Sequence, residues 1–171
     1  LGAYKARTAP FNVNYRYVSE ELRYLFTTLD MKCLVYGAEF ESEVATTAPL
    51  VPTLKTLLRV GGGAPAAGVE DFAAVVAAGS PDLDDPGRSD DDIYMLCTGG
   101  TTGMPKGVMW PQKAIFMAAL GGGGIYFRRP PIQRPEELAE FVPHGPPLVY
   151  FAVAPLMHGA AMWASLIALF A

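Results

Sequence analysis

Apolar residues near the start of the chain recur at the spacing of a helix. Leu22, Leu25, Phe26 and Leu29 stand at i, i+3, i+4 and i+7, and Ser19 precedes them as a candidate cap. The pattern predicts an amphipathic helix with one core-facing stripe.

Short apolar runs alternate with helical stretches over the next fifty residues. The runs 33–36 and 57–60 each end at glycine and predict buried strands. Helical patterns begin near Glu41 and cover 69–78. This alternation predicts an α/β fold, with a mostly parallel sheet and flanking helices.

The second half of the chain changes pattern. Apolar residues at 93–97 and 108–110 flank a Gly/Thr-rich loop and predict a strand–loop–strand hairpin. Pro111 is expected in the first turn of a helix that ends at the glycines 121–124, and a short helix is expected at 135–141.

The segment 148–171 is the most apolar part of the sequence. A membrane-spanning helix needs about 20 mostly apolar residues, and Pro155, His158 and Gly159 interrupt this stretch. It predicts a buried strand, a turn and a buried helix, and no transmembrane segment.

Three parts are therefore expected. They are a first α/β part at 1–81, an acidic connector at 82–92, and a third part at 93–171 that carries the Gly/Thr-rich loop and the segment discussed below as a candidate pocket. The connector holds six aspartates. Their spacing matches no metal-binding pattern, so the connector is predicted to be a solvated link.

Composition narrows the function to small-molecule chemistry. With 171 residues, 51% of them hydrophobic, the chain can bury a substantial core. Its net charge of −4 offers no broad cationic surface for nucleic acid or anionic membranes. Cys33 and Cys97 lack metal-type spacing, which fits a reducing cytoplasm. Because the sequence begins at Leu1, a segment of a longer protein is expected.

The loop 98–107 reads TGGTTGMPKG and suits phosphate. Its glycines permit close backbone approach, its threonines supply hydroxyl donors and its lysine supplies a full charge. The predicted ligand-binding residues are Thr98, Gly99, Gly100, Thr101, Thr102, Gly103 and Lys106. A P-loop NTPase is disfavoured because Gly107, and no Ser or Thr, follows Lys106.

The run TGGTTGMPKGV, preceded by the apolar residues 93–96, resembles the phosphate-binding signature of the adenylate-forming (AMP-binding) superfamily. This superfamily includes acyl-CoA synthetases, peptide-synthetase adenylation domains and luciferases. A second run, Pro-Leu-Met-His-Gly at 155–159, resembles its carboxylate-pocket segment. With 4–7, 12–17 and the glycines 121–124, the likeness is greatest to bacterial fatty-acid and steroid-side-chain acyl-CoA synthetases.

The resemblance implies a reaction and assigns roles. A small-molecule carboxylic acid would react with ATP to give an acyl-adenylate, and CoA would then accept the acyl group. Lys106 and the loop would hold the phosphates, Thr98 would help to bind Mg²⁺, and His158 would orient the carboxylate. Lys106 and His158 are thus the predicted catalytic residues.

The superfamily's aromatic-Gly-x-Thr-Glu segment, ribose-binding aspartate and C-terminal lysine do not occur in the chain. The resemblance therefore implies an internal part of the large N-terminal domain, inactive alone, whose partner is the missing downstream half of its own enzyme. Two alternatives stay open: a non-catalytic phosphate-binding or interaction module, and an adenylation domain that feeds a carrier protein.

The remaining candidate residues favour structural roles. Trp110, Met117 and Trp163 lie on apolar stretches and are predicted to pack in the core, and His144 is predicted to lie on the surface. A structural role is also preferred for Asn12, Asn14 and Arg16.

Overall fold

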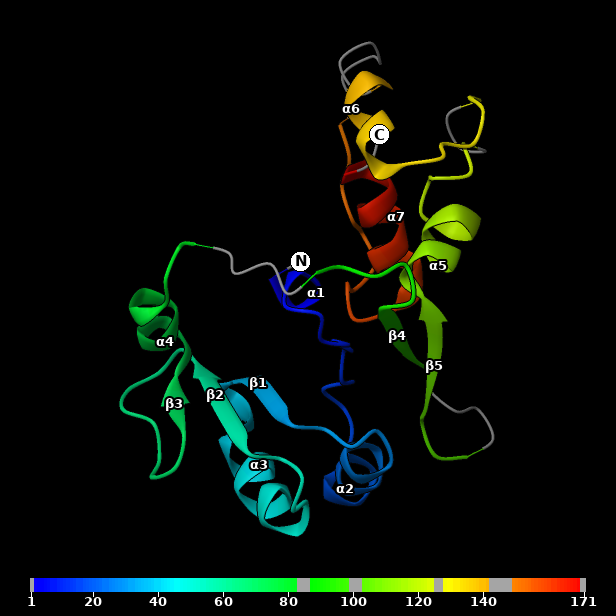
Figure 1. Cartoon of the computed structure of the whole chain (residues 1–171). Helices are drawn as coiled ribbons and strands as arrows, with labels where there is room; N and C mark the ends of the chain where they lie inside the picture. The colour runs from blue at the N-terminus through cyan, green and yellow to red at the C-terminus, as the bar shows by residue number, and fades with distance from the viewer. Residues whose placement is uncertain (1, 83–86, 99–102, 125–127, 142–148, 170–171) are drawn as a thin grey trace. The chain divides into compact units, whose positions relative to one another are not determined.

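The computed structural model describes residues 2–82, 87–98, 103–124, 128–141 and 149–169. The chain divides into two compact units, each described here by itself (Figure 1). The first unit contains Leu1–Val13, Asp85–Cys97 and Val108–Ala171. The second contains Asn14–Asp84 and Thr98–Gly107.

A parallel three-stranded sheet forms the second unit and confirms the predicted α/β class. Strands β1 (Cys33–Gly37), β2 (Thr56–Val60) and β3 (Glu70–Asp71) follow the order β1-β2-β3. Leu34 pairs with Leu57, and Leu58 pairs with Glu70.

Strand β3 was not expected, because the sequence pattern predicts a helix over the whole of 69–78. In the structure the helix begins only at residue 72, and the strand lies before it. Helix α4 spans Phe72–Ala78, and the Asp71 carboxylate accepts a hydrogen bond from the Ala74 N–H at 2.8 Å. This N-cap satisfies a free backbone donor and sets the start of the helix.

Helix α2 (Ser19–Thr28) packs against helix α3 (Glu41–Thr47). Leu22, Leu25 and Phe26 are buried as predicted. The predicted cap is wrong by one position: Ser19 is the first helical residue and Val18 occupies the N-cap. The Val18 N–H donates to the Glu21 carboxylate at 3.0 Å, so Glu21 closes this helix end. Short 3₁₀ turns at Ala38–Phe40 and Ala48–Leu50 flank α3.

The hairpin in the second half of the chain is confirmed. Strands β4 (Ile93–Thr98) and β5 (Lys106–Pro111) form a two-stranded sheet, and helix α5 (Gln112–Ala119) follows directly. Pro111 is the N-cap of α5 and not part of its first turn. The other elements are α1 (Gly2–Lys5), a 3₁₀ turn at Pro135–Glu137, α6 (Leu138–Phe141) and α7 (Gly159–Leu169).

An aromatic cluster fills the core of the first unit. Tyr94 on β4 is 3% exposed; the Tyr4 ring stacks on it and the Trp110 ring lies tilted beside it, each with centroids 6.1 Å apart. The Trp163 ring meets that of Trp110 edge to face at 5.9 Å. Core roles for Trp110 and Trp163 are therefore confirmed. Burial in the same cluster raises the pKa of the Tyr4 hydroxyl to about 12.

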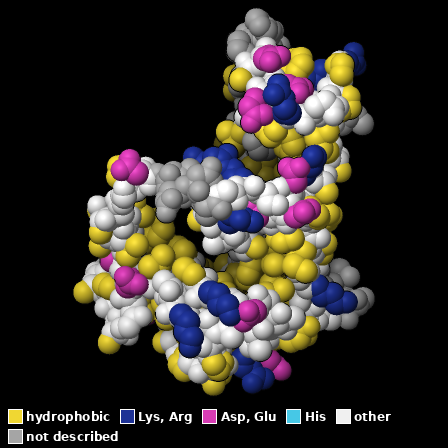
Figure 2. Space-filling model, viewed as in Figure 1, with side chains coloured by type: hydrophobic (Ala, Val, Ile, Leu, Met, Phe, Trp, Pro, Cys, Tyr) yellow, Lys and Arg dark blue, Asp and Glu magenta, His cyan; other side chains and the backbone are white. Residues whose placement is uncertain are grey.

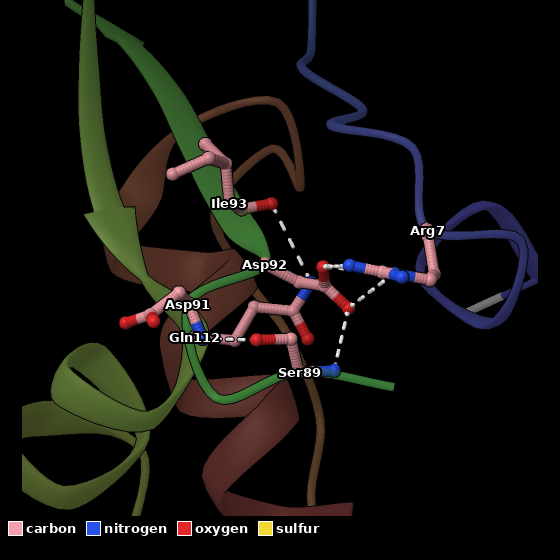
Figure 3. Close-up of polar contacts among 6 residues, drawn as sticks. All are labelled: Arg7, Ser89, Asp91, Asp92, Ile93 and Gln112. Atoms are coloured by element: carbon pink, nitrogen blue, oxygen red, sulfur yellow. Dashed lines mark hydrogen bonds and ion pairs between the residues drawn. The ribbon is translucent and has the colours of Figure 1, made fainter. Parts of the chain in front are cut away.

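An ion pair holds the N-terminal segment to the base of β4 (Figure 3). The Arg7 guanidinium donates to both carboxylate oxygens of Asp92, from Nε at 3.0 and 3.2 Å and from Nη2 at 2.9 Å. The Ser89 N–H donates to the same carboxylate at 3.1 Å, and the Asp92 carbonyl accepts from the Gln112 N–H at 2.7 Å. Ser89 and Asp92 thus hold the end of the acidic connector at β4, while the other described residues of the connector are exposed.

The segment before α7 departs from the prediction of a buried strand. Val149, Phe151 and Val153 are 82–95% exposed and form no strand. In the described part of the chain no neighbouring strand pairs with them, so their backbone has no ladder to join. In α7 only Ala161 is buried, and the predicted buried helix is half-exposed. No helix among the described residues is long and apolar enough to cross a bilayer.

Hydrophobic side chains gather on the face of the molecule drawn in Figure 2. Lys and Arg side chains lie interspersed there with Asp and Glu.

Truncation of the largest fully buried side chain tests the core of the second unit. Phe26 is 2% exposed, so Phe26→Ala is expected to lower the free energy of unfolding by about 3–5 kcal/mol in urea titrations. Tyr24→Ala, on the exposed side of the same helix, is the matched control. Equal losses in the two variants would contradict the predicted burial of this stripe.

Acidification tests the Arg7–Asp92 pair. Arg7, and then the Ser89 N–H, hold the pKa of the Asp92 carboxyl below its usual value. Its contribution to stability is therefore complete above the usual carboxyl pKa of about 4 and is lost as the pH falls through the lowered value. We expect Asp92→Asn to lower the melting temperature at pH 7, with the difference from wild type shrinking below about pH 4.

The control for this experiment is Asp90→Asn, which removes an ion pair between exposed side chains, Asp90 and Lys113. Such pairs contribute little. A pH-independent effect of Asp92→Asn would show that its carboxylate charge is not what stabilises the base of β4.

Candidate functional site

The predicted phosphate loop joins the two strands of the hairpin. Thr98 is the last residue of β4 and Lys106 the first residue of β5. The Thr98 hydroxyl donates to the Lys106 carbonyl at 3.4 Å, which brings the two predicted ligands together at the base of the loop. Gly99, Gly100, Thr101 and Thr102 lie outside the described residues.

The residues at the end of the loop that joins β5 indicate an anion site. Pro105 is buried and restrains the backbone, while the following residue, Lys106, is exposed. Within the described ranges the Lys106 ammonium forms no ion pair. Among the described residues, no atom lies within 4 Å of a Cβ placed on Gly103, so they leave space beside the backbone there. A positive charge without a carboxylate partner beside open backbone can receive a phosphate.

The described loop residues also fit Mg²⁺ bound together with a polyphosphate. The Thr98 hydroxyl donates its proton and keeps oxygen lone pairs, which are ligands of the kind that Mg²⁺ takes. No group of three or more His, Cys, Asp or Glu side chains is poised for a metal in the part of the chain that the structure describes. Mg²⁺ would thus be held mainly by substrate phosphates and water, as is common for this ion.

Cys97 is the nucleophilic side chain nearest to the loop in sequence. Burial raises the pKa of its thiol to about 11, so the reactive thiolate is scarce at neutral pH. Cys97 therefore serves packing. Both Cys33 and Cys97 are free cysteines.

His158 lies in a turn that leads directly into α7. Its N–H donates to the Pro155 carbonyl at 3.1 Å, and its own carbonyl accepts the Met162 N–H at 3.1 Å. The imidazole is exposed. The backbone of His158 is thus fixed at the start of the helix while its ring stays accessible to a ligand.

The two predicted motifs fall in different units. Thr98, Gly103 and Lys106 belong to the second unit, and His158 belongs to the first. Their roles in binding and catalysis stay predictions. His144 lies outside the described residues.

Asn12 holds the His158 turn and was assigned only a general structural role from sequence. Its side-chain amide donates to the Leu156 carbonyl at 3.1 Å and lies 3.4 Å from the Met162 sulfur. The two partners are 144 and 150 residues away. No local pattern could have revealed so remote a contact. By contrast, the Asn14 carboxamide accepts from the nearby Arg16 N–H at 3.0 Å.

Comparison with known proteins places these features in a family. The family model of the AMP-binding enzyme matches residues 1–171. The medium/long-chain-fatty-acid–CoA/3-oxocholest-4-en-26-oate–CoA ligase of Mycolicibacterium smegmatis is 42% identical over 176 residues, covering 100% of this chain and 32% of that protein. The medium-chain acyl-CoA ligase Mig of Mycobacterium avium is 39% identical over 172 residues, covering 99% and 31%.

Similarity in structure extends to more distant proteins. A natural red-emitting luciferase from Phrixothrix hirtus matches with a TM-score of 0.67 and 17% identity, over 96% of this chain and 38% of that one. This likeness shows the fold alone. The chain spans about a third of the length of the curated relatives named above. Since the family model covers all of its residues, the chain belongs to the AMP-binding enzyme family.

Proposed function

We propose that the chain is the phosphate-binding part of an ATP-dependent acid–thiol ligase, which activates a carboxylic acid as an acyl-adenylate and transfers the acyl group to CoA. The observation that carries the proposal is the pairing of the Thr98 hydroxyl with the exposed Lys106 at the base of a Gly/Thr-rich loop. The similarity to two acyl-CoA ligases over the whole chain supports it.

The proposed reaction has two steps. A carboxylate oxygen attacks the α-phosphorus of ATP, and the bond from that phosphorus to the bridging oxygen breaks as pyrophosphate leaves. The CoA sulfur then attacks the acyl carbon, AMP leaves with the bond electrons, and the thiol proton passes to solvent or a base. Both reactants of the first step are anions, so the step needs charge neutralisation and alignment.

The described residues would supply these needs. Lys106 would neutralise the charge that develops on pyrophosphate, and Thr98 would contribute an oxygen to the coordination of Mg²⁺. Mg²⁺, when bound, would neutralise part of the negative charge of the phosphates. His158, exposed at the start of α7, would hold the substrate carboxylate in line with ATP.

An apolar acid is the proposed substrate. The residues that follow His158 form a helix made of small and apolar residues apart from one serine, and such residues suit an aliphatic chain. The relative from Mycolicibacterium smegmatis is named for medium/long-chain fatty acids and 3-oxocholest-4-en-26-oate, and the relative from Mycobacterium avium for medium-chain acyl groups. Transfer to CoA is favoured over transfer to a carrier protein because both relatives are CoA ligases.

Other parts of the proposed enzyme would complete the site. Val149, Phe151 and Val153 present apolar side chains that the described residues leave uncovered. Burial of such side chains is favourable, by about 25 cal/mol per Å² of apolar surface. The downstream half of the same ligase is the proposed partner of this segment.

Removal of the loop cation tests the proposal. In the ligase that contains this chain, Lys106→Ala is expected to slow acid-dependent ATP–pyrophosphate exchange by roughly 100-fold, because a charge aimed at the leaving group is lost. Lys113→Ala, which also removes an exposed lysine, is the matched control and is expected to keep the wild-type rate. Exchange unaffected by Lys106→Ala would exclude this lysine from the site.

The chain by itself is expected to bind but not to turn over. Equilibrium titration with MgATP should show weak binding that Lys106→Ala abolishes, since the loop is only one of the groups that ATP needs. Incubation with ATP, a fatty acid and CoA should yield no acyl-CoA. Formation of acyl-CoA by the purified chain would contradict the division of labour proposed here.

A further inference from the structure

Strand β4 and helix α7 contact each other through two residues on each element, and these residues are separated by similar distances. Tyr94 and Leu96 are two apart on a strand, and Gly159 and Trp163 are four apart on a helix, so each pair shares one face. The two pairs span similar lengths, about 6.6 Å along the strand and about 6 Å along the helix. We call these four residues the β4–α7 contact.

A hydrogen bond joins Tyr94 of the strand pair to Trp163 of the helix pair. The Trp163 indole N–H donates to the Tyr94 hydroxyl at 2.7 Å, inside a cluster where Tyr94 is 3% exposed. A buried indole N–H needs a partner, and here the partner is a tyrosine that is itself stacked on Tyr4. The hydrogen bond therefore fixes Trp163, and the helix that carries it, opposite Tyr94 on β4.

Close packing joins the other two residues, Leu96 of the strand and Gly159 of the helix. A Cβ placed on Gly159 would lie 2.7 Å from the Leu96 Cδ2. Only glycine fits at this distance unless Leu96 moves. The first turn of α7 is therefore held directly against β4, one residue after His158.

The His158 turn is held from its other side as well. The Asn12 amide donates to the Leu156 carbonyl at 3.1 Å, and the His158 carbonyl accepts the Met162 N–H. Restraints thus act before and after His158. Meanwhile β4, two residues beyond Leu96, ends at Thr98 in the phosphate loop.

We propose that the β4–α7 contact positions His158 for the carboxylate by holding the start of α7 at a fixed height on β4. The proposal rests on the proposed function. Tyr94, Leu96, Gly159 and Trp163 are positioning residues, since none of them would touch the reacting atoms. Their removal should disturb use of the acid more than use of ATP.

The test uses ATP–pyrophosphate exchange by the ligase that contains this chain, with KM measured separately for the fatty acid and for ATP. Gly159→Ala is expected to raise the KM for the acid about tenfold, because a displacement of about 1 Å can cost up to 100-fold in rate. The KM for ATP is expected to change less than about twofold. Leu96→Ala, added to Gly159→Ala, should return the KM for the acid toward wild type, because it vacates the space that the new methyl group needs.

Two more variants complete the design. Ser165→Ala, a small change elsewhere on α7, is the control and is expected to leave both KM values unchanged. Trp163→Phe removes only the indole N–H and is expected to raise the KM for the acid about threefold; it decides the question if Gly159→Ala fails to fold. Circular dichroism of each variant establishes that it has folded.

The outcomes separate the two claims. A wild-type ligase without acid-dependent exchange overturns the proposed function, and this inference with it. An active wild type in which folded Gly159→Ala, or in its absence Trp163→Phe, keeps the wild-type KM for the acid overturns the inference alone. Equal increases in both KM values, without rescue by Leu96→Ala, overturn it too, because they indicate general damage.

Discussion

The burial of Tyr94 is the interaction on which the first unit depends. Its ring lies against Tyr4 and Trp110, and its hydroxyl accepts the Trp163 indole proton. These partners come from the N-terminal helix, from β5 and from α7, so one side chain joins segments far apart in sequence. A two-stranded hairpin is marginal in water by itself, so β4 depends on such contacts beyond its partner strand.

The site follows from the same strand. Arg7 and Asp92 fix the beginning of β4, the aromatic cluster fixes its middle, and the phosphate loop follows from its end. A loop that must neutralise a developing charge works best when its supports do not reorganise during the reaction. In the proposed function these supports of β4 would supply the preorganisation, and Thr98 and Lys106 would contact the phosphates.

The sequence predicted local features well and remote ones poorly. The stripe of Leu22, Leu25 and Phe26, the parallel strands and the hairpin were correct because periodicity and glycines report local structure directly. The phosphate loop could be proposed from the sequence because its chemistry is concentrated within ten residues, and its role stays a prediction. Strand β3 is only two residues long and left no periodic signal. At the start of α2, Val18 and not Ser19 is the N-cap, because the Glu21 carboxylate accepts the Val18 N–H.

The failures at 148–171 have a physical cause. An apolar run predicts burial, but burial also needs a surface to cover it, and the described residues supply none for Val149, Phe151 and Val153. The contacts of Asn12 and Trp163 join residues 144 and 69 positions apart, and no single-sequence pattern encodes such pairs.

The central claim is that this chain serves an AMP-forming activation of a carboxylate. The most direct measurement is the fate of ¹⁸O placed in the carboxylate of a fatty acid, when the ligase that contains the chain forms acyl-CoA. Attack of that carboxylate on the α-phosphorus predicts one ¹⁸O atom in the AMP released. Label in inorganic phosphate, or AMP free of label, would contradict the account.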